Sequence, residues 1–160
     1  MEKQQAPSKF NMVMFLRTMI IGIFGGLFAG IFLLIQHYFN MTEVNPKTIL
    51  YWIFQDGKWM EKWYAYIIVL LLFSLLSAII AHIYYFLFKK QESWVVGALY
   101  GIAVWATLYV LVPVLINGYN PFDNLESESH VSMFCLLVLH GVFTGYSISF
   151  EYANIKEEYK

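Results

Sequence analysis

The amino-acid sequence predicts an all-α integral membrane protein in which four transmembrane helices form a bundle. Three observations support this fold class. Hydrophobic residues make up 59% of the 160 residues and charged residues only 13%, so the chain lacks the polar groups that cover a soluble domain. Four apolar runs are each long enough to cross a bilayer, and none of them contains Asp, Glu, Lys or Arg. A chain of this length is expected to form a single membrane domain, residues 1–160.

The four runs cover residues 18–39, 66–88, 94–116 and 131–150. Each has about the 20 helical residues that cross roughly 30 Å of hydrocarbon. Because lipid offers the backbone no hydrogen-bond partners, such runs are expected to be helices. Polar and apolar residues do not alternate along them, which argues against the strands of a membrane barrel.

The first helix is expected to begin before its apolar run. Ser8 is a candidate N-cap, residues 10–16 are mostly apolar, and Arg17 can extend its guanidinium to the lipid headgroups. The run is too long for the core of a signal peptide, which has about 7–15 residues. The sequence therefore predicts an uncleaved membrane span.

The connection after the first span, residues 40–64, is rich in aromatic residues. Asn45-Pro46 has the pattern of an N-cap followed by proline at the first helical position, and Asp56-Gly57 has the pattern of a helix end. Trp and Tyr favour the headgroup zone. The pattern predicts a short interfacial helix, and an irregular aromatic loop is the alternative.

The other two connections differ in length and charge. Residues 89–93 form a tight turn, which predicts that the second and third spans are antiparallel neighbours. Pro113 is expected to kink or end the third helix ahead of Asn117-Gly118. The third connection, residues 117–130, is polar and acidic.

The lysine and arginine residues predict the orientation of the chain. Seven of the ten lie in the first 17 residues, the 89–93 turn and the C-terminal tail, whereas three lie in the first connection. Cytoplasmic segments carry the excess of positive charge. The distribution therefore predicts that both termini are cytoplasmic.

Small residues four apart mark the faces on which membrane helices pack. Lipid tails are as apolar as leucine, so helices associate through close backbone contact. Seven glycines form such patterns in the first, third and fourth spans: Gly22, Gly26, Gly30, Gly97, Gly101, Gly141 and Gly145. In the second span Ser74 pairs with Ala78, and Ser77 with Ala81. These faces are expected to pack within the bundle; on the first span, pairing of two copies of the chain is the alternative.

The fourth span carries the most polar face. His140, Thr144, Ser147 and Glu151 share one side of this helix by their spacing. His140 lies near mid-depth, where an ionisable side chain is a candidate for proton relay, ligand binding or pairing with another helix. A neutral imidazole held in a helix contact is the structural alternative. His82 lies nearer the cytoplasmic surface, where packing is the expected role.

Other classes of function find little support in the sequence. A net charge of −1 without a basic stripe gives no reason to expect nucleic-acid binding. Cys135 is the one cysteine, and the group formed by Asp123, Glu126, Glu128 and His130 lacks the ligand order of a calcium loop, so no metal or cofactor is expected. The spans contain no acid, and no phosphate-loop or hydrolase motif occurs, so the protein is not expected to be an enzyme.

Residues 94–101, with the sequence WVVGALYG, and residues 141–152, with GVFTGYSISFEY, resemble segments of the YqhR family of small membrane proteins from Bacillus-type bacteria. The glycine-rich start of the first span and the Asn45-Pro46 connection are also similar, so the resemblance covers most of the chain. It implies a multi-span protein of the bacterial plasma membrane, and it implies no particular activity.

The expected function is a non-enzymatic one that works through contacts in the bilayer. The protein would be a scaffold, an assembly factor or an accessory subunit, and its partner would be a membrane protein or a second copy of the chain. The surplus of packing glycines and the scarcity of reactive groups motivate this hypothesis. The alternative is a small transporter or channel subunit with a polar path along the His140 face.

Overall fold

The computed structural model is all-helical over the residues it describes, which are 5–54, 57–91, 93–115 and 125–158. Its elements are α1 (Gln5–Tyr38), α2 (Thr48–Phe54), the 3-10 helix η2 (Lys58–Glu61), α3 (Ala65–Phe88), α4 (Trp94–Leu115) and α5 (Ser127–Glu158). The helices α1, α3, α4 and α5 are long and apolar enough to cross a membrane, which confirms the predicted fold class.

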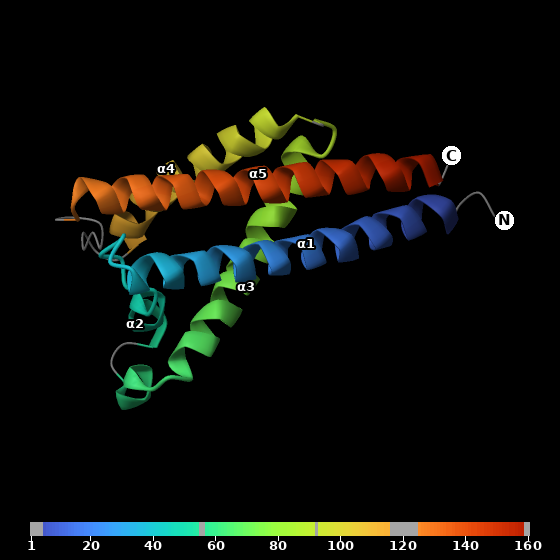
Figure 1. The fold of residues 1–160 in the computed structure, drawn as a ribbon. Coiled ribbons are helices and arrows are strands. Elements are labelled where there is room, and N and C mark those ends of the chain that lie inside the picture. Colours follow the sequence, from blue (N-terminus) through green and yellow to red (C-terminus); the bar gives the residue numbers. More distant parts are fainter. Residues whose placement is uncertain (1–4, 55–56, 92, 116–124, 159–160) are drawn as a thin grey trace.

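The four long helices form two packed pairs. α1 packs most extensively on α3, and α4 packs most extensively on α5, while contact between α1 and α5 joins the pairs. Figure 1 shows α1 and α5 side by side and antiparallel, with both termini at one end of the molecule, and α3 crossing α1 steeply. The opposite end carries α2, the end of α1 and the start of α5, and it is called the loop end below.

The prediction that α3 and α4 are packed neighbours holds only near the turn that joins them. There the ring of Tyr100 lies 5.1 Å from the ring of Tyr84, and the Tyr100 hydroxyl donates a hydrogen bond of 2.7 Å to the carbonyl of Ile80. Beyond the turn the two helices diverge (Figure 1). The glycines of α4 lie instead against the backbone of α5, to which they allow close approach.

Two helix ends differ from the prediction. α1 begins at Gln5, so Ser8 lies inside the helix and the N-cap assignment was wrong. α5 continues to Glu158, past the predicted end of its span. Both extensions are explained by their mutual packing, because Phe10 of α1 meets Tyr152 of α5 with ring centroids 5.8 Å apart and Ile155 is buried beside them.

The observed end of α4 agrees in part with the end that the sequence predicts. The helix passes through Pro113 and is described as far as Leu115. Proline is tolerated there because neighbouring groups in a membrane bundle can take up the freed carbonyl. Asn117-Gly118, predicted to follow the helix end, lies outside the described residues.

The predicted short helix in the first connection is present as α2. The Asn45 side chain accepts a 2.9 Å hydrogen bond from the N–H of Lys47, just ahead of the helix. Leu50 of α2 is fully buried together with Met60, and both pack against the start of α3 at Ala65. The predicted stop at Asp56 falls outside the described residues.

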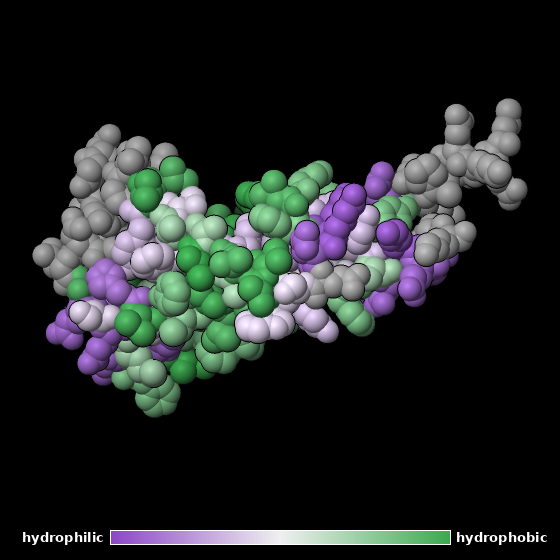
Figure 2. All heavy atoms as spheres, turned by 90° about the horizontal axis from the view of Figure 1, so that it is seen from above, coloured by the Kyte–Doolittle hydropathy of each residue, from purple (hydrophilic) through white to green (hydrophobic). Residues whose placement is uncertain are grey.

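Polar and apolar side chains are separated along the long axis of the bundle. Figure 2 shows a broad hydrophobic band between hydrophilic groups at the loop end and at the terminal end. Large hydrophobic side chains such as Phe24, Leu71 and Leu99 are exposed on the long helices. Such a surface suits acyl chains as solvent and agrees with four membrane-spanning helices.

Candidate functional site

The interior of the bundle is organised by glycines that bring helix backbones together. A Cβ atom added at Gly22 would lie 2.5 Å from the Cα of Ala78, and one at Gly26 would lie 2.5 Å from the carbonyl oxygen of Phe73. The small-residue faces predicted on the first and second spans therefore pack on each other. Gly30 differs, because its nearest neighbour would be the flexible tip of Leu70 at 2.8 Å.

The contact between α4 and α5 is equally close. A Cβ at Gly101 would lie 2.5 Å from the carbonyl oxygen of Leu137, and a Cβ at Gly141 would lie 2.5 Å from that of Gly97. A Cβ at Gly145 would meet the Cα of Gly97 at 2.8 Å. All seven predicted packing glycines thus lie inside the bundle, which explains them without a second copy of the chain.

His140 is buried where α5 faces both α1 and α3. Its Nε2 atom lies 3.2 Å from the hydroxyl oxygen of Ser77, and the two groups share a hydrogen bond across the helix contact. Gly25 of α1 leaves room for the ring, because a Cβ there would lie 3.1 Å from the Cε1 atom of His140 and 3.1 Å from Oγ1 of Thr144. A core polar cluster therefore consists of His140, Ser77 and Thr144 around Gly25.

This core polar cluster keeps some unused hydrogen-bonding capacity. The Nδ1 atom of His140 and the Oγ1 atom of Thr144 are both buried, and neither has a hydrogen-bond partner of good geometry among the described residues. Burial of an unpaired polar atom is costly in an apolar medium. The cluster therefore has two buried polar atoms that could bond a small polar ligand or a proton.

The remaining residues of the predicted polar face lie away from this cluster. Ser147 is half-buried, and Glu151 forms an ion pair with Arg17, with 3.9 Å between the Nη1 and Oε1 atoms. Arg17 is the residue that was expected to reach the headgroups, and its side chain is 57% exposed. The face is thus divided between the bundle core and the solvated end of α5.

His82 occupies a packing position on α3. Its Nδ1 atom lies 2.8 Å from the carbonyl oxygen of Ala78 on its own helix, and its ring lies 4.5 Å from the ring of Phe15. The contacts of His82 differ from those of His140, which faces Ser77. The structure therefore does not combine the two histidines into one site.

A groove opens where α3 and α4 diverge. It has two hollows, of about 180 and 70 Å³, that share several apolar lining residues such as Leu33, Phe73 and Met133. The larger hollow reaches Glu43 in the first connection, and the smaller one reaches His140. Sequence reasoning missed this groove because it depends on the angle between two helices, which no local pattern encodes.

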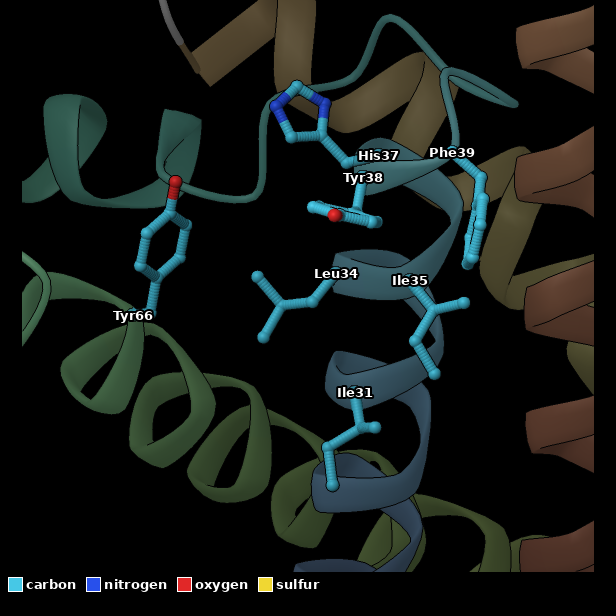
Figure 3. A pocket seen from close by; sticks show the side chains of 7 residues that line it. All are labelled: Ile31, Leu34, Ile35, His37, Tyr38, Phe39 and Tyr66. Atoms are coloured by element: carbon cyan, nitrogen blue, oxygen red, sulfur yellow. The ribbon is translucent and has the colours of Figure 1, made fainter.

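A larger cavity of about 440 Å³ lies between the loop ends of α1 and α3. Figure 3 shows its lining residues, which are Ile31, Leu34, Ile35, His37, Tyr38, Phe39 and Tyr66. Sequence reasoning did not predict this cavity. The aromatic residues at the ends of the two spans were the sequence feature that could have indicated this cavity.

Two hydrogen bonds of Glu43 join the first connection to the third. Oε2 of Glu43 accepts a 2.9 Å hydrogen bond from the N–H of Glu126, and the N–H of Glu43 donates to the hydroxyl of Ser129 at 2.9 Å. The His130 ring is hydrogen-bonded to the Tyr109 hydroxyl. Asp123 lies outside the described residues, and among those described no three potential metal ligands gather.

Comparison with known proteins identifies the family of the chain. The model of a family described as conserved membrane protein YqhR matches residues 1–160. The chain belongs to the YqhR family. Uncharacterized protein YqhR of Bacillus subtilis (strain 168) is 29% identical to it over 157 residues, which cover 98% of this chain and 85% of the relative. No solved structure matches the chain.

Membership of the YqhR family agrees with the four apolar helices and confirms the resemblance inferred from the sequence. The two segments that carried the resemblance pack on each other in the fold. Gly97 and Gly101 belong to the first segment, and Gly141 and Gly145 belong to the second. These two segments therefore form part of the α4–α5 contact.

Proposed function

We propose that the protein is a non-enzymatic accessory subunit that binds another membrane protein through the free face of α4. One observation carries this proposal. α4 is held to the bundle mainly along α5, and of the four candidate spans it buries the smallest share of its length. Leu99, Ile102 and Val110 are accordingly exposed. A transmembrane helix that is packed on one side offers its other sides to a neighbour in the bilayer.

The chemistry of this face favours a transmembrane helix as the partner. Ala103 and Ala106 are exposed, and these small side chains permit close approach of a second backbone. The hydroxyl of the neighbouring Thr107 donates a 2.7 Å hydrogen bond to the carbonyl of Ala103 on its own helix. The face therefore needs no polar partner and suits a helix with small residues at the contact.

The state of the reactive groups supports a role without catalysis. A nucleophile needs a base that a third group orients, and the groups at membrane depth here are engaged differently. His140 contacts Ser77 through a hydrogen bond between helices, and Gly25 closes the site from the α1 side. Glu151 is paired with Arg17 toward the terminal end. These contacts are typical of a structural scaffold.

Site-specific photo-crosslinking in living cells tests the proposal. A photoreactive amino acid at Ala106 is expected to give an adduct with a different membrane protein. The same amino acid at Phe24, an exposed position on α1, is the matched control and is expected to give only lipid adducts. If Ala103, Ala106 and Val110 all yield no protein adduct, the proposal is rejected. If they yield only a crosslinked homodimer, the partner is a second copy of the chain.

A small transporter or channel subunit is the second candidate, and one observation favours it. The smaller hollow of the α3–α4 groove reaches Ser77 and His140 from the side of the bundle. A flux assay in proteoliposomes tests this candidate, and His140→Leu is expected to abolish any flux. Absence of flux from the unmodified protein would leave the accessory role.

A further inference from the structure

We propose that the cavity between the loop ends of α1 and α3 binds an anionic phospholipid, with its acyl chain along α1 and its phosphate beside Lys47. This site is separate from the α4 face, so it does not rest on the proposed function. Two independent observations carry the proposal: a buried lysine that has no carboxylate partner among the described residues, and a cavity whose lining changes from apolar to polar.

Lys47 is the first observation. It is only 8% exposed, and in the part of the chain that the structure describes its ammonium has no carboxylate within ion-pair distance. Its Nζ atom lies 4.2 Å from the centroid of the Tyr66 ring, which offers partial compensation through a cation–π contact. Lysine is almost never buried unless it is paired. The ammonium therefore lacks an anion.

The cavity is the second observation, and Tyr66 connects it to Lys47. The Tyr66 ring both lines the cavity and contacts the ammonium. Figure 3 shows the side chains of Ile31, Leu34 and Ile35 along α1, with His37 and the Tyr66 hydroxyl toward the connection that carries α2. The lining therefore passes from apolar to polar in the same direction as a lipid passes from acyl chain to headgroup.

The surroundings favour a lipid over other occupants. The cavity, about 440 Å³, lies within the range of small-molecule pockets, roughly 300–1,000 Å³. At its rim Tyr38 is 80% exposed and Phe39 66% exposed, and exposed aromatic rings at a span end are typical of the headgroup zone. A soluble anion would leave the apolar lining at Ile31 and Leu34 without a partner.

Native mass spectrometry of the full chain, released from micelles with added phosphatidylglycerol or phosphatidylcholine, tests the headgroup contact. The unmodified protein is expected to retain phosphatidylglycerol preferentially. Lys47→Gln is expected to lower that retention about tenfold, to the level of phosphatidylcholine, whereas Lys47→Arg keeps the preference. Lys62→Gln, an exposed lysine of the same connection, is the matched control and is expected to change nothing. Unchanged preference in Lys47→Gln overturns the proposal.

A second variant tests the acyl contact independently of the charge. Leu34→Trp fills the cavity and is expected to reduce retention of both lipids, while Ile20→Trp, at an exposed position elsewhere on α1, is not. The melting temperature with inorganic phosphate distinguishes the source of the anion. If phosphate alone stabilises the protein as much as phosphatidylglycerol does, or if Leu34→Trp binds both lipids normally, the lipid site is rejected.

Discussion

His140 shows how a single polar residue can be accommodated in a membrane bundle. Its imidazole shares a hydrogen bond with Ser77, and the missing side chain of Gly25 makes space for the ring. Hydrogen bonds between membrane helices are worth about 0.6 kcal/mol on average and up to about 1.7 kcal/mol. The bond is therefore a modest contribution to stability, but it fixes which faces of α3 and α5 meet.

Removal of the Ser77 hydroxyl tests this contact. Ser77→Ala is expected to lower the free energy of unfolding in mixed micelles by about 1 kcal/mol, because a buried imidazole nitrogen loses its partner. Ser74→Ala is the control, since that hydroxyl donates only to the Leu70 carbonyl of its own helix, at 2.7 Å. A double-mutant cycle with His140→Leu should give a coupling of similar size. Equal losses for the two serine variants would contradict the assigned pair.

At the scale of the helix, backbone proximity decides which glycines can be replaced. Gly26 and Gly30 belong to the same small-residue pattern, yet their surroundings differ. A Cβ at Gly26 meets backbone atoms of Phe73 and Ser74, whereas one at Gly30 meets the movable end of Leu70. The periodic pattern alone assigns the two positions the same importance.

Alanine substitution separates the two glycines. Gly26→Ala is expected to cost roughly 1–3 kcal/mol of unfolding free energy, because α1 and α3 must move apart to admit the methyl group. Gly30→Ala is expected to cost much less, because Leu70 can change rotamer. Thermal unfolding of the two variants in the same detergent measures the difference. If Gly30→Ala is the more damaging variant, the register of the α1–α3 contact is incorrect.

The start of α5 is stabilised by a residue from another part of the chain. Glu43 accepts the Glu126 N–H and donates its own N–H to Ser129, which reproduces a capping box between two segments. These two hydrogen bonds, called the Glu43 clasp below, fix the first connection against the beginning of the fourth span. It also places a carboxylate at the positive end of the helix dipole.

The loss of stability caused by removing the Glu43 clasp can be estimated. Glu43→Ala is expected to destabilise the protein by about 0.5–2 kcal/mol, the usual range for an N-cap, because the Glu126 N–H loses its acceptor. Glu43→Gln keeps an acceptor oxygen and should recover part of the loss. Glu61→Ala, at an exposed residue of η2, is the control for charge alone. Hydrogen exchange at the start of α5 should rise only in the Glu43 variants.

The whole molecule is two helix pairs joined along α1 and α5, with both termini at one end. The positive charge of the sequence predicts that this end is cytoplasmic, since seven of ten lysines and arginines belong to the N-terminal segment, the 89–93 turn and the C-terminal tail. The Arg17–Glu151 pair belongs to the same end, and because it is exposed it contributes little to stability. The charges thus bear on orientation more than on folding.

Cysteine accessibility tests the orientation. In a Cys135→Ala background, Lys58→Cys is expected to react with a membrane-impermeant maleimide on intact cells. Lys156→Cys is expected to react only after the membrane is permeabilised. Both positions are exposed, so a difference in labelling reports the side of the membrane rather than burial. The reverse pattern of labelling would mean that the termini are outside.

The sequence predicted local features of the fold better than its long-range ones. Apolar runs gave the four spans, and glycine spacing gave the packing faces, because both are periodic along one helix. The partner of each face could not be predicted, since Ser77 and His140 are separated by 63 positions and nothing local relates them. The 89–93 turn suggested packing of α3 on α4, whereas the glycines of α4 favour α5.

α5 runs without a break from the clasp at Glu126 to the charged terminal end at Glu158. Its 32 residues extend over about 48 Å at 1.5 Å per residue, well beyond the roughly 30 Å of hydrocarbon. A continuous rod of this length acts as a mechanical strut. A displacement of its loop end along the helix axis would be passed toward the other end, whereas a helix broken at mid-depth would absorb more of it.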